Sequence, residues 1–99
     1  MNNCSFIVNI TKDIEMKYFD SGKCKASFSI AVNEGKDKTI FIDCEAWEKQ
    51  AELIGSHFEK GSKIGIVARY AKESYEKDGQ NRTKHYFVVN NITFCDKKQ

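Results

Sequence analysis

The segment formed by residues 40–61 changes its hydrophobic period halfway along, and this change constrains the fold more than any other feature. Up to Trp47 the side chains alternate, so that Ile40, Ile42, Cys44 and Ala46 share one face. From Trp47 onward the spacing is helical, with apolar residues at Trp47, Ala51, Ile54 and Phe58. Gly61 supplies a helix stop signal, and a strand resumes at Lys63. The segment therefore predicts a strand that runs directly into one helix of about three turns.

The second face of this strand carries two large aromatic residues beside two acids. Phe41 and Trp47 alternate there with Asp43 and Glu45. A solvated strand face does not usually leave large aromatic rings in water without a partner. This face therefore suggests a surface on which flat ligands stack.

The rest of the chain reads as strands. Alternating patterns predict one long, bent strand over residues 4–18 and further strands over residues 24–33, 63–75 and 82–94. Asp78 and Gly79 mark a hairpin turn between the last two. Five strands with one helix between the third and the fourth predict an all-β chain with a single helix. This is the element order of the OB-fold, a five-stranded Greek-key barrel.

Length and composition predict one domain over residues 1–99, because 99 residues suffice for one modest core. The absence of a membrane-length apolar run and of a signal segment predicts a soluble, intracellular protein without a membrane partner. Cys4, Cys24, Cys44 and Cys95 lie far apart, which favours reduced, mostly buried thiols over a metal site. The net charge of +2 is small, so any affinity for nucleic acid must come from local placement of lysines.

With these elements placed, the chain resembles bacterial-type single-stranded DNA-binding proteins from about Cys4 to Cys95. Several short stretches carry the resemblance. They are Thr11-Lys12-Asp13 with Glu15, Met16 and Tyr18, Ser21-Gly22-Lys23, Phe28-Ser29-Ile30-Ala31-Val32-Asn33, Phe41-Ile42-Asp43, Ala46-Trp47, Lys49, Ala51-Glu52, Lys60-Gly61-Ser62, Arg69, Ser74-Tyr75-Glu76, Asp78-Gly79-Gln80 and Val88-Val89.

The resemblance implies that bases stack on Phe41, Trp47 and Tyr75, all of which are aromatic here. Each base stacked on an aromatic ring contributes about 1 to 3 kcal/mol and tolerates any sequence. The expected phosphate partners are Lys12, Lys23, Lys25, Arg69 and Lys72. Asp43 and Glu45 oppose binding, but at a surface dielectric each costs about 1 kcal/mol or less, so stacking should dominate.

The chain departs from the family pattern in three places. Val8, Asn9 and Ile14 stand where a glycine, a basic residue and a proline are usual. The loop of residues 34–38 holds no aromatic residue, which removes one platform found in some members. The acidic, hydrophobic C-terminal tip that recruits replication enzymes is absent, which fits either a trimmed form or a small protein of phage or mobile-element type.

The expected function is sequence-nonspecific binding and protection of single-stranded DNA in replication, recombination and repair, in the cytoplasm and associated with the nucleoid. A homo-oligomer, either a dimer or a tetramer, is expected because an open barrel leaves strand edges to cover. Any contacts with replication proteins would not use an acidic tail. The rival hypothesis is an OB-fold adaptor of primosomal type that acts through protein contacts and binds DNA weakly.

An enzyme is not expected. The carboxylate pairs Asp13 with Glu15 and Asp43 with Glu45 have the spacing of an ordinary strand face, and no nucleophile joins them. His57 and His85 read as surface residues. The sequence predicts no catalytic residue, no metal ligand and no cofactor.

Overall fold

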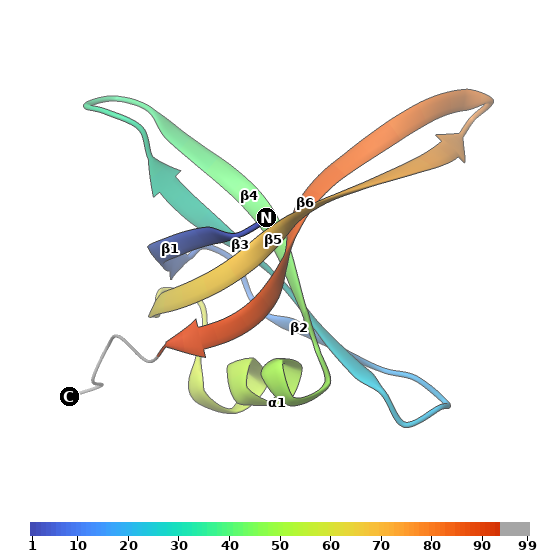
Figure 1. The fold of residues 1–99 in the computed structure, drawn as a ribbon, viewed down its shortest axis with the longest axis horizontal. Helices are drawn as coiled ribbons and strands as arrows, with labels where there is room; N and C mark the ends of the chain where they lie inside the picture. The colour runs from blue at the N-terminus through green and yellow to red at the C-terminus, as the bar shows by residue number, and fades with distance from the viewer. Residues whose placement is uncertain (94–99) are drawn as a thin grey trace.

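The computed structural model describes residues 1–93, which form six strands and one helix (Figure 1). The elements in chain order are β1 (Cys4–Ile10), β2 (Glu15–Tyr18), β3 (Cys24–Asn33), β4 (Thr39–Trp47), α1 (Glu48–His57), β5 (Lys63–Lys77) and β6 (Gln80–Thr93). The predicted long first strand is divided into β1 and β2, because residues 11–14 leave the extended pairing. The end predicted for the last strand, Phe94, and the fourth cysteine, Cys95, lie outside the described residues.

The sheet closes on itself. Its strand order is β1-β5-β6-β4-β3-β2, and β1 also pairs with β3 through Asn9 opposite Ala31 and Ile10 opposite Ile30. This pairing joins the two ends of the β1–β5–β6–β4–β3 series into a barrel, so the predicted OB-fold is confirmed. The helix follows β4 and precedes β5, which is the predicted position once the first strand is counted as two.

The core follows the alternation of the strands. Its largest fully buried side chains are Phe28, Ile10, Ile30, Ile54 and Ile64. Burying a side chain of this size stabilises the fold by about 1.5 to 3 kcal/mol. The helix α1 closes one end of the barrel (Figure 1) and turns Ala51 and Ile54 into this core.

The helix is shorter at both ends than its sequence predicts. Trp47 and Phe58, which the helical spacing includes, both have extended backbones and flank the helix as its caps. Gly61 does not end the helix, because the helix ends four residues earlier, at His57. With φ at +93°, Gly61 instead belongs to the turn that leads into β5, and its N–H donates to the carbonyl of Ile10 at 2.8 Å.

A long hairpin arm made by β5 and β6 projects from the barrel (Figure 1). Asp78 and Gly79 both have positive φ at its tip, as a two-residue type I′ turn requires, so the predicted hairpin is confirmed. Nearer the barrel the register shifts, because Ala68 pairs with Val89 while Val67 pairs with Asn91. The extra residue, Asn90, breaks the alternation of β6, so that Val89 and Ile92, three positions apart, both contact the core.

Three cysteines lie within the described residues, and all three are free. Cys24 and Cys44 are buried and Cys4 is half-buried, as the sequence predicts. Burial raises the pKa of the Cys44 thiol to about 12, and the charge of Asp43 adds to the rise. Within residues 1–93, no helix has the length and apolar character needed to cross a membrane.

Candidate nucleic-acid interface

The outward face of β3 and β4 is continuous, because directly opposite residues of an antiparallel pair project to the same side. The register places Ala31 opposite Phe41, Ser29 opposite Asp43, Ser27 opposite Glu45 and Lys25 opposite Trp47. Phe41 is 68% exposed on this face. The strand therefore holds the two predicted aromatic platforms, Phe41 and Trp47, on one surface with both acids between them.

Trp47 lies at the end of this face and outside the core cluster. Its ring stacks on Phe19, with centroids 5.7 Å apart and planes inclined by 17°. The indole N–H donates to Oε2 of Glu45 at 3.0 Å. The ammonium of Lys25 lies 5.6 Å from the Trp47 ring centroid, and that of Lys17 lies 5.2 Å from the Phe19 ring centroid. The indole is thus half-buried in an aromatic and cationic cluster on the surface.

Phe19 and Lys17 were not among the sequence-predicted site residues. They continue the alternation of β2, where Glu15, Lys17 and then Phe19 follow at steps of two. Lys17 pairs with Lys25 of β3 and therefore projects to the same side as Trp47. The alternation of β2 could have pointed to Phe19 and Lys17. It was not sufficient for Phe19, because this residue directly precedes the turn at residues 20–22 and its stacking partner, Trp47, lies far away in sequence.

The hairpin arm adds a second set of residues to this side. Arg69 pairs with Val88 and Tyr75 with Arg82, and residues at odd positions of β5 share one face of the arm. Glu45 of β4 pairs with Val88 of β6 in a short parallel contact, which brings this face alongside the β3–β4 face. Tyr75 is 44% exposed.

Tyr86 and Lys84 belong to the same face of the arm, and neither is among the eight predicted site residues. The ammonium of Lys84 lies 5.2 Å from the Tyr86 ring centroid. Burial raises the pKa of the Tyr86 hydroxyl, the charges of Glu45 and Glu73 add to the rise, and Arg69 opposes it. Glu45 of β4 lines one pocket together with Lys84 and Tyr86, so side chains of β4 and β6 meet at this point.

Lys72 is the one predicted residue that the structure separates from the others. It pairs with His85 and has the opposite parity from Arg69 and Tyr75, so it projects from the reverse face of the arm. That reverse face carries Tyr70, whose ring stacks beside His85 and whose hydroxyl is hydrogen-bonded to Nδ1 of that histidine.

The two remaining predicted lysines lie at different ends of the outward face. Lys12 follows β1 and lines a polar pocket between β4 and β6. Lys23 lies in the turn before β3, where its carbonyl accepts the N–H of Phe19 at 2.9 Å, so it is close to the Trp47 cluster. Of the eight predicted residues, seven are consistent with one side of the molecule and Lys72 is not.

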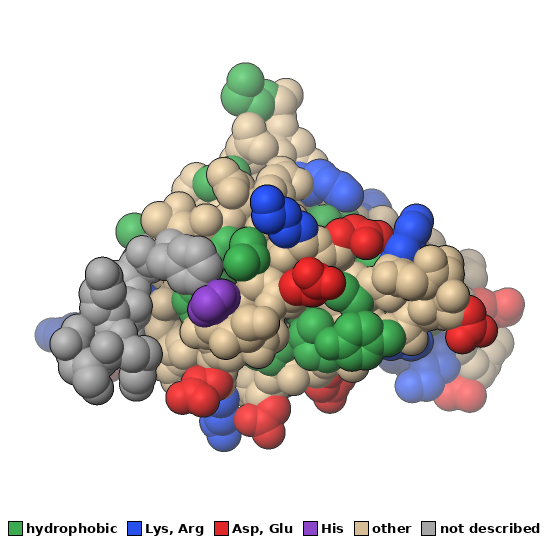
Figure 2. All heavy atoms as spheres, turned by 90° about the horizontal axis from the view of Figure 1, so that it is seen from below, with side chains coloured by type: hydrophobic (Ala, Val, Ile, Leu, Met, Phe, Trp, Pro, Cys, Tyr) green, Lys and Arg blue, Asp and Glu red, His purple; other side chains and the backbone are tan. Residues whose placement is uncertain are grey.

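The charges on this side are mixed. Asp43 accepts a hydrogen bond from the Ser29 hydroxyl at 2.9 Å, and Lys25 lies 3.9 Å from Oε1 of Glu45. Figure 2 shows the neighbouring face of the molecule, on which α1 lies, and there too acidic, basic and apolar side chains are interspersed. Affinity for an anionic polymer would therefore come from the local placement of a few cations, and much of the energy from aromatic stacking.

Within residues 1–93, no group of three or more histidine, cysteine, aspartate or glutamate side chains is placed to hold a metal ion. The arrangement offers aromatic rings, cations and hydrogen-bond acceptors on an open surface, which suits binding of an extended, charged and flat-ringed polymer.

Comparison with known proteins agrees with this description. The chain is 32% identical over 106 residues to "Single-stranded DNA-binding protein 3" of Listeria innocua, an alignment that covers 100% of this chain and 66% of that protein. It is 36% identical over 97 residues to a single-stranded DNA-binding protein of Fusobacterium nucleatum, covering 90% and 63%. A relative from onion yellows phytoplasma is 34% identical, covering 99% and 97%. The chain thus spans about two thirds or less of the length of the first two relatives.

A solved structure entitled "Plasmodium falciparum SSB complex with ssDNA" superposes with a TM-score of 0.88 at 19% identity, over 97% of this chain and 96% of that one. At this identity the likeness establishes the fold. The pattern of the "Single-strand binding protein family" matches residues 1–95, which is nearly the whole chain. The chain therefore belongs to the single-strand binding protein family.

Proposed function

We propose that this chain binds single-stranded DNA with little dependence on sequence, and that it protects exposed strands during replication, recombination and repair. The observation that carries the proposal is the single outward side on which Phe41, Trp47 and Tyr75 lie with Lys25 and Arg69. Bases would stack on the rings while the cations contact phosphates. The family membership and the names of the relatives support the same ligand.

The energetic balance favours binding despite the acids on this face. Three stacked bases contribute about 3 to 9 kcal/mol in total, at 1 to 3 kcal/mol each. Asp43 and Glu45 each oppose a nearby phosphate by about 1 kcal/mol or less at a solvated surface. Lys25, at 3.9 Å from Glu45, offsets part of that repulsion.

The sole tryptophan, Trp47, provides the test. Titration with oligothymidine should strongly quench its fluorescence. The logarithm of the binding constant should fall by about 0.7 per phosphate contact for each tenfold rise in salt. Absence of both quenching and salt-dependent binding would refute the proposal.

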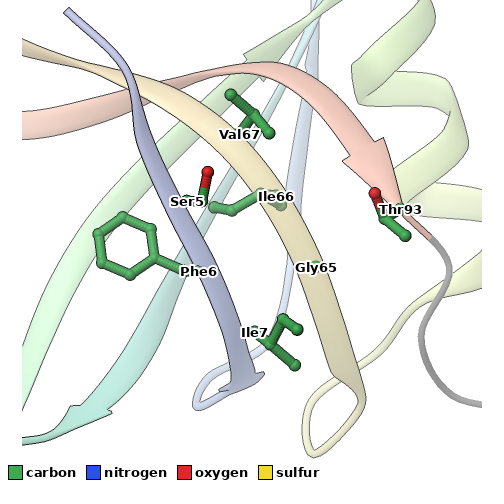
Figure 3. Close-up of a pocket in the computed structure, with 7 residues that line it drawn as sticks. All are labelled: Ser5, Phe6, Ile7, Gly65, Ile66, Val67 and Thr93. Atoms are coloured by element: carbon green, nitrogen blue, oxygen red, sulfur yellow. The ribbon is translucent and has the colours of Figure 1, made fainter.

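We also propose that the chain forms a homo-oligomer through the free edge of β1. Residues 4–9 pair with β5 along one edge, whereas pairing to β3 is confined to Asn9 and Ile10. Ile7 is 70% exposed on this strand. Figure 3 shows the adjoining pocket of about 480 Å³, to which β1 and β5 contribute most of the lining, with Ile7 and Ile66 among its side chains.

A second copy would continue the sheet at this edge and cover Ile7. Sedimentation equilibrium should therefore give a mass of a dimer or a tetramer, and Ile7→Lys should lower it. A monomeric mass for the unaltered chain at micromolar concentration would contradict the proposal. We place the protein in the cytoplasm, in contact with nucleoid DNA, and assign it binding without catalysis.

The rival function, an adaptor of primosomal type, is favoured by one observation. The acids Asp43 and Glu45 lie between the two rings of β4, where a dedicated DNA surface would carry cations. The fluorescence titration separates the two functions, because an adaptor would show weak quenching while still binding a purified replication protein.

A further inference from the structure

A polar pocket of about 200 Å³ opens between β4 and β6. Its polar and aromatic lining comes from Asp43 and Glu45 of β4, Lys84 and Tyr86 of β6, Lys12, Glu15 of β2 and Ser27 of β3. The volume is smaller than the roughly 300 to 1,000 Å³ of pockets that hold drug-sized ligands. Along β4 it falls between the two stacking platforms proposed above, so a strand bound to both would cross it.

Tyr86 gives this pocket an aromatic wall. Its ring is half-buried. Lys84 lies over the ring, and Lys12, in the segment that follows β1, also lines the pocket. The pocket therefore combines one ring with two cations, the groups that hold a base and its flanking phosphates.

Of the three carboxylates that line this pocket, Asp43 is the one that is both held in place and left with a free oxygen, whereas the exposed Glu15 has no hydrogen bond within residues 1–93 that fixes it. Ser29 is buried, with 7% of its surface exposed, and its hydroxyl donates to Oδ1 of Asp43 at 2.9 Å. This bond fixes the carboxylate and leaves Oδ2 open. By contrast, both oxygens of Glu45 have neighbours, the indole N–H at Oε2 and Lys25 at Oε1.

A fixed carboxylate distinguishes between bases by their hydrogen-bonding groups. It accepts a hydrogen bond from the amino group at N4 of cytosine, whereas thymine has a carbonyl oxygen at the same position. The carbonyl oxygen and the carboxylate are both acceptors, so they repel each other at this position. The only donor that thymine can offer is N3–H, and the carbonyl oxygens on both sides of it also repel the carboxylate, so the bond to cytosine is favoured. The same carboxylate repels phosphate, which directs a base edge into the pocket and leaves the backbone to the lysines.

We propose that this pocket accepts one base of the bound strand against Tyr86, and that Asp43 makes it favour a base with an amino group, such as cytosine, over thymine. The inference rests on the proposed function, to which it adds a modest base preference. Ser29 is a positioning residue in this scheme, because it acts only through Asp43.

The test compares oligocytidine with oligothymidine, both deoxy strands of about 12 nucleotides, within the usual span of one OB-fold. Fluorescence anisotropy at neutral pH gives Kd for each strand with the unaltered protein and with Asp43→Asn. The ratio of the thymine Kd to the cytosine Kd should fall about fivefold in Asp43→Asn, the lower end of the discrimination of one good side-chain contact to a base edge. Differences in flexibility between the two oligonucleotides cancel when the two ratios are compared, because the same oligonucleotides are used with both proteins.

Glu59→Gln is the matched control, since it removes one exposed negative charge after the helix and away from the pocket. Its ratio should equal that of the unaltered protein. An unchanged ratio in Asp43→Asn, or an equal change in Glu59→Gln, would overturn the inference while leaving DNA binding in place. Failure of the unaltered protein to bind either strand would instead overturn the proposed function.

Tyr86→Leu supplies a second variant that keeps an apolar side chain while removing the ring. Both strands should bind about fivefold more weakly, as expected for the loss of one stacked base. Circular dichroism checks that the barrel is intact. Unchanged affinity in a folded Tyr86→Leu protein would show that no base occupies the pocket.

Discussion

Phe41→Ala isolates the stacking contribution, because Phe41 makes little contact with the rest of the protein. Its side chain is 68% exposed and takes no part in the core cluster. The substitution therefore removes little packed volume, and the main loss to the strand is the difference in β-propensity. We expect the free energy of unfolding to fall by less than about 1 kcal/mol.

The effect on DNA binding should be larger than the effect on stability. A base that loses its aromatic platform loses about 1 to 3 kcal/mol of binding free energy. At RT of about 0.59 kcal/mol this corresponds to an affinity lower by about 5- to 150-fold. The electrostatic contacts remain, so the salt dependence of the binding constant should stay unchanged.

Titration of Trp47 fluorescence with oligothymidine measures this effect, since the indole remains in the variant. Tyr18→Ala is the matched control. Tyr18 is 72% exposed, but it pairs with Cys24 and therefore projects to the opposite side from Lys17 and Trp47. Equal affinities for the two variants, or a loss in Phe41→Ala that stability explains, would refute the stacking argument.

Three further predictions concern charge, pH and the hairpin. Lys25→Met should weaken binding and lower the slope of log K against log salt by about 0.7, measured by the same titration at several salt concentrations. Burial raises the pKa of the Cys44 thiol from 9.0 to about 12, so between these pH values the folded state keeps the thiol proton while the unfolded state loses it. The free energy of unfolding should therefore fall as pH rises from 9 to 12, by up to about 1.4 kcal/mol per pH unit. Denaturant melts should show this loss in the unaltered protein and a smaller one in Cys44→Ala. Gly79→Ala, at φ of +78°, should destabilise the turn by about 1 kcal/mol or more, detected as faster exchange of arm amides by NMR.

The alternation in the sequence predicts the barrel and the outward side of β4 well, because one face of each strand must be buried. Ile42, Cys44 and Ala46 point inward and Phe41 and Asp43 outward, as predicted. The helix ends were harder to predict. Trp47 satisfies both the period of a strand and that of a helix, and only the observed backbone shows that it ends the strand.

Other errors have different physical origins. Lys72 was predicted to lie beside Tyr75, but the two residues are three positions apart on β5. An odd separation along a strand places side chains on opposite faces, so the alternation alone could have excluded Lys72. The partnership of Phe19 with Trp47 depends on the register of three strands, which local patterns do not contain. The roles of the eight predicted residues in DNA binding stay predictions.

The parallel contact between β4 and β6 consists of only two residue pairs, Cys44 with Phe87 and Glu45 with Val88. It is the seam at which the two halves of the outward side meet. Phe41 and Trp47 lie on one half and Tyr75 on the other, so a polymer bound to all three would span one of the two shortest strand pairings of the barrel. The bound polymer would then raise the thermal stability of the barrel, because the polymer would have to dissociate before this strand pairing could open.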